Sequence, residues 1–119
     1  MTSRADVLGP VEAHLAAFNA RDVNGVMALF AEDAVFATAD QIVVGRRGLR
    51  VLFGDSFAAP VTAALELRHA VIADDTAACE LVERLTLPSG ETTELPVAAF
   101  YTVRDGTLVR IRVYRDLPV

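Results

Sequence analysis

The feature that most constrains this chain is a single change in the period of its apolar residues. Before Val61 they recur at helical spacing, as Val11, Leu15 and Phe18 do, and from Val61 onward they alternate with a period of two. Long antiparallel strands that follow helices predict an α+β fold, with the helices on one face of a curved sheet. The alternating stretches predict strands at 62–73, 76–88, 93–104 and 107–116.

The first half of the chain carries recognisable helix boundaries. Pro10 suits the first turn of a first helix, and Asp22 can cap a second, short helix over 23–30. A short strand is expected at 33–38, and a third helix at 46–57. The joints between the later strands have hairpin chemistry, at Asp74-Asp75, Pro88-Ser89-Gly90 and Arg104-Asp105-Gly106.

Size and charge narrow the class of protein. The 119 residues, of which 53% are hydrophobic, fit one domain spanning 1–119. A net charge of −5 is unfavourable for nucleic acid, and no apolar run reaches the roughly 18 residues needed to span a bilayer. We therefore expect a cytoplasmic protein without nucleic-acid or membrane partners. With Cys79 the only cysteine and His14 and His69 the only histidines, we expect no metal site, and no motif indicates a cofactor.

Several segments together resemble one superfamily. The resemblance lies in 11–22 (VEAHLAAFNARD), 27–34 (MALFAEDA), 45–50 (GRRGLR), 96–100 (PVAAF) and 112–116 (RVYRD). These segments resemble the nuclear transport factor 2-like superfamily, in its ketosteroid isomerase-like and polyketide cyclase-like branch. The resemblance implies a cone-shaped fold, in which a curved antiparallel sheet wraps on three N-terminal helices around an apolar pocket for a small molecule. It says little about activity, because this fold hosts unrelated functions.

The resemblance also assigns positions for two known chemistries. Ketosteroid isomerase uses a tyrosine, a carboxylate base and a neutral aspartic acid, and these positions fall on His14, Thr38 and Ala98. The limonene-epoxide hydrolases resemble the chain at 83–86 (ERLT), where Thr86 replaces one catalytic acid, and Val113 replaces the other. The sequence therefore predicts neither a standard isomerase nor a hydrolase of that mechanism.

The same resemblance fixes which row of each strand should face the pocket. The inward rows are expected to be Ala78, Glu80, Val82, Arg84 and Thr86, then Ala98, Phe100 and Thr102, then Ile111 and Val113. A slip of one residue would turn every one of these side chains to the other face.

Three residues are candidates for catalysis. His14 shares a helix face with Val11 and Phe18, and histidine titrates near neutral pH. Asp40 follows the first strand, close to the superfamily's base, and Arg84 would stabilise charge in the pocket. The alternatives are a half-buried structural histidine, a turn-forming aspartate and a solvated arginine. The expected substrate-binding residues are Phe18, Thr38, Phe53, Phe57, Glu80, Val82, Thr86, Ala98, Phe100 and Val113.

The outward rows predict a self-association surface. An apolar patch without a covering helix usually marks an interface, and we expect a homodimer through the outer sheet face. The expected patch consists of Leu81, Leu85, Leu87, Val97, Ala99 and Tyr101.

Three functions remain open from the sequence. The favoured one is a cofactor-free acid/base enzyme of isomerase, cyclase or hydrolase type, acting on a compact hydrophobic substrate. The others are a non-catalytic binding module for a small apolar ligand and a protein-interaction module.

Overall fold

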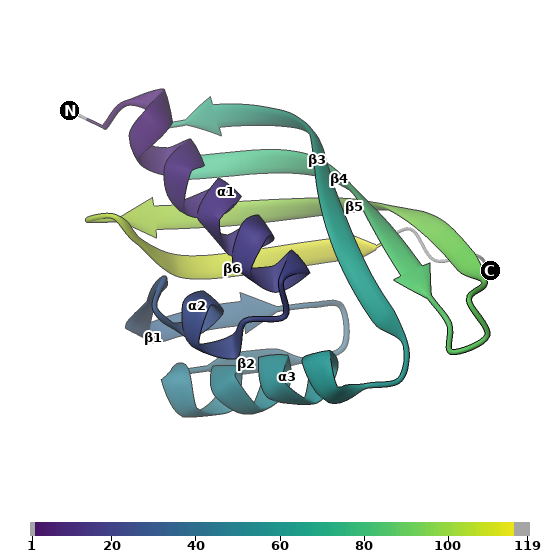
Figure 1. Cartoon of the computed structure of the whole chain (residues 1–119). Coiled ribbons are helices and arrows are strands. Elements are labelled where there is room, and N and C mark those ends of the chain that lie inside the picture. Colours follow the sequence, from purple (N-terminus) through teal and green to yellow (C-terminus); the bar gives the residue numbers. More distant parts are fainter. Residues whose placement is uncertain (1, 116–119) are drawn as a thin grey trace.

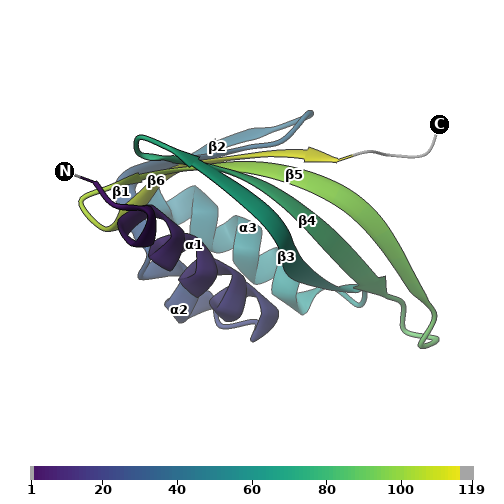
Figure 2. The same ribbon diagram turned by 90° about the horizontal axis from the view of Figure 1, so that it is seen from above.

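The computed structural model describes residues 2–115, in which helices cover one face of a single curved sheet (Figure 1). Viewed from above, α1, α2 and α3 all lie on the same side of the sheet, and its other side is bare (Figure 2). This arrangement confirms the predicted α+β fold. The elements are α1 (Arg4–Asn19), α2 (Val23–Met27), β1 (Phe30–Ala37), β2 (Ile42–Val44), α3 (Arg46–Ala58), β3 (Thr62–Ala73), β4 (Thr76–Thr86), β5 (Thr92–Arg104) and β6 (Thr107–Arg115).

The sheet has six strands in the order β2-β1-β6-β5-β4-β3. The three long hairpins pair antiparallel as predicted, and β1 joins β6 in parallel. The hairpin turns use backbone that favours glycine, aspartate or asparagine, with φ of 54° at Asp74, 91° at Gly90 and 77° at Gly106. None of the described helices is long and apolar enough to cross a membrane.

The first helix begins earlier than predicted. Ser3 accepts a hydrogen bond from the backbone N–H of Asp6 at 3.1 Å, and Asp6 accepts one from the N–H of Ser3 at 3.0 Å. This reciprocal capping satisfies two backbone donors that a helix start leaves free. Pro10 consequently lies inside the helix and not in its first turn. The prediction failed because Gly9-Pro10 was interpreted as the boundary.

Other elements also differ from the prediction, and β1 begins at Phe30 and not at 33. The second helix ends at Met27, because the chain already enters β1 at Phe30. The short strand β2, which pairs with the end of β1, was not predicted. The end of β4 lies at Thr86 and not at 88, and the predicted last residue of β6, Asp116, lies outside the described residues.

The inward rows of β4 and β5 are the reverse of the prediction. On β4 the buried side chains are Ala77, Cys79, Leu81 and Glu83, and on β5 they are Val97, Ala99, Tyr101 and Val103. Both rows are one residue out of phase with the expected ones, because the apolar row packs on the helices and the row with Glu80 and Arg84 faces solvent. The predictions that Ala78, Glu80, Val82, Arg84, Thr86, Ala98, Phe100 and Thr102 face inward are therefore wrong. On β6 the inward positions of Ile111 and Val113 are confirmed, since both are buried.

Most of the predicted outer patch is wrong for the same reason, although Leu87 is exposed. Leu81, Val97, Ala99 and Tyr101 are buried in the core and cannot form a surface. The large apolar side chains exposed on β3, β5 and β6 are instead Val71, Phe100 and Tyr114. A homodimer through the outer face stays a prediction, now with different residues.

Candidate functional site

A small cavity lies between the helices and the inner face of the sheet. Its volume is about 40 Å³, and we call it the inner cavity. Most of the wall is aromatic or aliphatic, and the polar side chains in it belong to His14, Tyr101 and Arg115. The residues around the inner cavity are His14, Phe18, Phe36, Phe53, Leu65, Leu81, Val97, Ala99, Tyr101, Ile111, Val113 and Arg115.

A second hollow of about 160 Å³ adjoins the inner cavity, and we call it the outer chamber. The two spaces share Phe18, Phe36, Phe53 and Arg115, so these side chains form the boundary between them. The outer chamber is more polar, and Gln41 at its edge is exposed. The residues around it are Phe18, Phe36, Thr38, Gln41, Leu52, Phe53, Ser56, Ala63, Glu83 and Arg115.

His14 is held in an aromatic cage on the helix α1. The inward face of this helix carries Val11, His14 and Phe18, all of them buried. The centre of the imidazole ring lies 5.5 Å from that of Tyr101 and 5.9 Å from that of Phe53. The Tyr101 hydroxyl is 3.4 Å from Nδ1 of His14, a long hydrogen bond between residues 87 positions apart in the chain.

Burial keeps both members of this pair neutral at pH 7. Loss of hydration lowers the pKa of His14 from 6.5 to about 4, because an imidazolium ion is costly in an apolar environment. The same effect raises the pKa of the Tyr101 phenol. Among the described residues, Nε2 of His14 has no hydrogen-bond partner although it is buried. A buried polar atom without a partner is unusual and calls for an explanation, such as a catalytic role or a bound water or ion.

The outer chamber contains an ion pair between a buried glutamate and an arginine whose side chain is 35% exposed. Glu83 is only 4% exposed, and its two carboxylate oxygens accept hydrogen bonds from Nε and Nη2 of Arg115 at 2.9 and 3.1 Å. This side-by-side contact is the strongest geometry that an arginine and a carboxylate adopt. The hydrogen bonds to Glu83 raise the pKa of Arg115, and the charge of Asp40 adds to the effect.

The two predicted polar residues after β1 lie at the edge of the outer chamber. Thr38 is part of the chamber wall, and its hydroxyl donates to a carboxylate oxygen of Asp40 at 3.0 Å. The carboxylate of Asp40 is exposed and does not line either space, although it is near enough to influence Arg115. Its geometry fits the turn-forming alternative, with a secondary electrostatic effect on the chamber.

Several predicted site residues do come together. His14 and Val113 line the inner cavity, and Phe18 and Phe53 line both spaces. Phe57 does not line them but supports their wall, since its ring centre lies 5.4 Å from that of Phe18.

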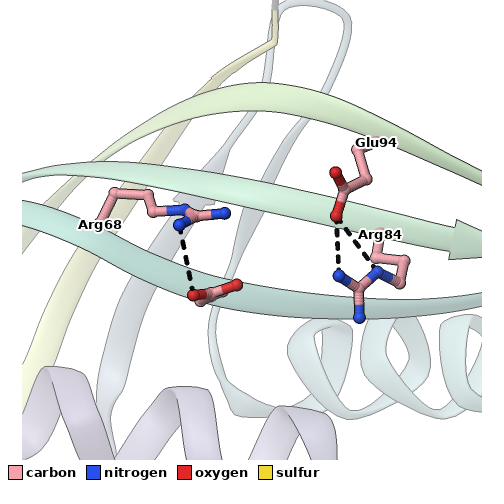
Figure 3. A network of polar contacts seen from close by, with 4 residues as sticks. Arg68, Arg84 and Glu94 are labelled. Atoms are coloured by element: carbon pink, nitrogen blue, oxygen red, sulfur yellow. Dashed lines mark hydrogen bonds and ion pairs between the residues drawn. The ribbon is translucent and has the colours of Figure 1, made fainter.

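The predicted residues of β4 and β5 lie on the opposite face of the sheet. Arg84 and Glu94 point toward each other there, in an exposed ion pair with an N–O distance of 2.8 Å (Figure 3). Arg84 was expected to stabilise charge in the pocket, and its outward position excludes contact with the inner cavity or the outer chamber. Glu80, Ala98 and Phe100 border a separate groove of about 210 Å³ on the outer face. Val82 lies beside Arg84 in a smaller hollow, and Thr86 lies in the outward row at the end of β4.

The sequence analysis missed several residues of the site, and among them Tyr101, Glu83 and Arg115 carry the polar groups that matter most. A signal for Glu83 was available, because it continues the row of Ala77, Cys79 and Leu81, and a charge within an apolar row needs a partner when buried. The contact of Tyr101 with His14 joins distant parts of the chain and could not be inferred from spacing.

A wider surface hollow of about 410 Å³ lies at the other end of the molecule, around Asp6, Asp75 and Arg104. It lies between polar loops and the start of α1, and in the described part of the chain no aromatic side chain or buried polar group lines it. Within residues 2–115, no three His, Cys, Asp or Glu side chains form a group that could hold a metal ion. The inner cavity and outer chamber are therefore the candidate site.

Comparison with known families supports the resemblance found in the sequence. The SnoaL-like domain family matches residues 11–111, which is most of the chain. The nuclear transport factor 2-like resemblance and its isomerase-like and cyclase-like branch are thereby confirmed. No curated protein matches the chain.

Solved structures with the same fold include proteins of several activities. An epoxide hydrolase of the limonene-epoxide hydrolase type from Mycobacterium tuberculosis superposes with a TM-score of 0.83 and 20% identity, over 94% of this chain and 84% of that one. A proposed polyketide cyclase from Xanthomonas campestris superposes with a TM-score of 0.81 and 26% identity, over 97% of this chain and 93% of that one. The epoxide hydrolase/cyclase-like enzyme SalBIII superposes with a TM-score of 0.85 and 21% identity, over 98% of this chain and 95% of that one. SalBIII has a role in pyran ring formation in the polyether salinomycin.

Proposed function

The chain belongs to the SnoaL-like family, and we propose that it is a cofactor-independent acid/base enzyme of isomerase, cyclase or hydrolase type, acting on a compact hydrophobic molecule. One observation carries this proposal. His14 is buried in an aromatic cage beside a cavity, is neutral at pH 7, and has no partner for Nε2 among the described residues. A substrate oxygen in the inner cavity would supply that partner.

The pair of His14 and Tyr101 can move a proton in two ways. When the Tyr101 hydroxyl donates to Nδ1, the proton of the imidazole is on Nε2, which then donates to a substrate oxygen. When Nδ1 donates to the Tyr101 oxygen, Nε2 becomes an acceptor and the tyrosine proton is available to the substrate. A neutral imidazole that polarises a carbonyl is an established catalytic arrangement in other enzymes. The apolar surroundings strengthen each of these hydrogen bonds.

The size of the site limits the substrate. The inner cavity of about 40 Å³ and the outer chamber of about 160 Å³ are small compared with the roughly 300–1,000 Å³ of typical ligand sites. A compact molecule with one ring fits this space better than a steroid does. The cyclase and epoxide hydrolase named among the structural relatives support acid/base chemistry on organic molecules.

Proton exchange with solvent provides a test that does not require the natural substrate. Small cyclic ketones and enones would be incubated with the protein in deuterium oxide, and deuterium entering the carbon next to the carbonyl would be followed by NMR. We expect wild type to accelerate exchange and His14→Gln to abolish most of the acceleration, by about a hundredfold or more. The matched control is His69→Gln, because His69 is exposed on the outer face. Exchange that is equal in wild type and His14→Gln would contradict the assignment.

A non-catalytic binding module is the second candidate, and the pKa of His14 favours it. An imidazole whose pKa is about 4 is a weak base at neutral pH, and catalysis is most effective when the pKa is near the working pH. This candidate predicts saturable binding of small ketones or alcohols without deuterium incorporation. Turnover of more than one molecule per site would exclude it.

A further inference from the structure

The ion pair of Glu83 and Arg115 is unusual because of its place in the sheet. Glu83 occupies the inward row of β4 after Ala77, Cys79 and Leu81, and Arg115 follows Ile111 and Val113 in the inward row of β6. Replacing a buried ion pair by apolar side chains of similar volume is often neutral or stabilising. Stability alone therefore does not explain a charged pair at these positions, and both of its side chains line the outer chamber.

The pair retains hydrogen-bonding capacity that faces the chamber. A carboxylate offers about four acceptor positions and a guanidinium five N–H donors, and the two hydrogen bonds between Glu83 and Arg115 use two of each. Both side chains line the outer chamber, and Arg115 also lines the inner cavity. A molecule lying across the two spaces would thus meet a strong acceptor and a strong donor side by side.

We propose that the Glu83–Arg115 pair binds a neutral hydroxyl group of the substrate, so that the protein acts on small alcohols or phenols whose apolar body lies against Phe18, Phe36 and Phe53. A hydroxyl donates its proton to Glu83 and accepts a hydrogen bond from Arg115, which matches both partners. This inference rests on the proposed function, since it assumes that the inner cavity and outer chamber are the substrate site.

Other polar groups match the pair less well. A carbonyl oxygen only accepts, so it can bond to Arg115 but cannot use the remaining acceptor positions of Glu83. An ammonium group only donates and is repelled by Arg115. A carboxylate faces repulsion from Glu83 and from nearby Asp40, whose charge acts on Arg115. The pair is electrically neutral as a unit, which favours a neutral ligand.

The test uses two probes of nearly equal shape. Para-isopropylphenol and para-cymene differ by a hydroxyl in place of a methyl group, and both are compact single-ring molecules. Binding to the full chain would be measured by NMR titration, with amide signals at His14 and Tyr101 reporting on the inner cavity. We expect wild type to bind the phenol at least about tenfold more tightly, because hydrogen bonds to charged groups are worth about that much.

Two variants connect this preference to the pair. Glu83→Leu combined with Arg115→Met should remove most of the preference for para-isopropylphenol over para-cymene. The matched control combines Glu94→Leu with Arg84→Met, which removes the exposed ion pair on the opposite face (Figure 3) and should leave the preference unchanged. Glu83→Gln keeps the size of the side chain. It should weaken the binding of the phenol and strengthen the binding of para-isopropylbenzoate, by about tenfold each.

The outcomes separate this inference from the proposed function. Equal binding of both probes to wild type, with signal changes at His14, would overturn the hydroxyl assignment and keep the site. A preference that survives both Glu83 variants would also overturn it. Failure of both probes to affect His14 and Tyr101 would overturn the proposed site and the inference together.

Discussion

The burial of His14 makes a quantitative prediction about stability and pH. In the unfolded chain the imidazole binds a proton near pH 6.5, whereas in the folded chain its pKa is about 4. Between these values the unfolded state binds more protons, so the free energy of unfolding falls as the pH falls. Because the pKa of His14 is lower in the folded state, the stability associated with its neutral form is complete above pH 6.5. This stability is lost as the pH falls toward 4.

The size of the effect follows from the two pKa values. A difference of one pKa unit corresponds to about 1.4 kcal/mol. Between about pH 7.5 and about pH 5, roughly 1.5 units of the pKa difference between the unfolded and folded states take effect. The contribution of His14 should therefore fall by about 2 kcal/mol over that range. The effect of the other ionisable groups cancels when wild type is compared with a variant that differs only at His14.

Urea unfolding of wild type and His14→Gln at several pH values measures this contribution. The difference between their free energies of unfolding should shift by about 2 kcal/mol against wild type as the pH falls to about 5. The matched control is His69→Gln, which changes an exposed histidine, leaves His14 in place and should keep the pH dependence that His14 causes. A difference between wild type and His14→Gln that does not change with pH would show that His14 is not buried in a neutral form.

Three further predictions concern other parts of the molecule. Arg115→Met leaves the buried Glu83 without its partner and should cost about 1–3 kcal/mol in urea unfolding, whereas the double variant with Glu83→Leu should recover most of that loss; equal losses in both would contradict the ion-pair assignment. Ser3→Ala removes the cap of α1 and should cost about 1 kcal/mol by the same assay, an effect that would be absent if the helix began at Pro10. We also propose a homodimer through the outer sheet face, where Phe100 is 43% exposed; Phe100→Glu should shift sedimentation from dimer to monomer, and a wild type that is already monomeric at micromolar concentration would refute it.

The fold was predictable because its signals are redundant. The change of period at Val61 and the glycine- and aspartate-rich turns define the three long hairpins independently of each other. The helical spacing of Val11, His14 and Phe18 placed His14 in the interior, and the structure agrees. Periodicity over many residues tolerates local exceptions, so these elements were identified correctly.

The assignment of the inward face of β4 and β5 was the principal error, and the hydrophobicity of the two rows could have corrected it. Strand alternation shows which side chains share a face but does not show which face is buried. On β4 the row of Ala77, Cys79 and Leu81 is more apolar than the row of Glu80 and Arg84, and the hydrophobic effect places the first row inside. Reliance on the superfamily alignment for the phase reversed this assignment and moved Arg84 into the expected pocket.

Other features could not have been predicted with the same rules. The strand β2 has three residues, too few for a period to be recognised. The hydrogen bond of Tyr101 to His14 and the ion pair of Glu83 with Arg115 join residues 87 and 32 positions apart, so they depend on the assembled sheet.

The start of α1, in contrast, could have been predicted, since Ser3 and Asp6 have the spacing of a reciprocal cap, but Gly9-Pro10 gave the stronger local signal.

The most direct test of the account is the NMR spectrum of the two histidine rings, labelled with nitrogen-15, during a titration with para-isopropylphenol or a small cyclic ketone. The account predicts that the Nε2 signal of His14 shifts and saturates as the buried atom gains a partner, while the signals of His69 on the outer face stay in place. Binding that moves the signals of His69 and leaves His14 unchanged would contradict the central claim that the inner cavity is the working site.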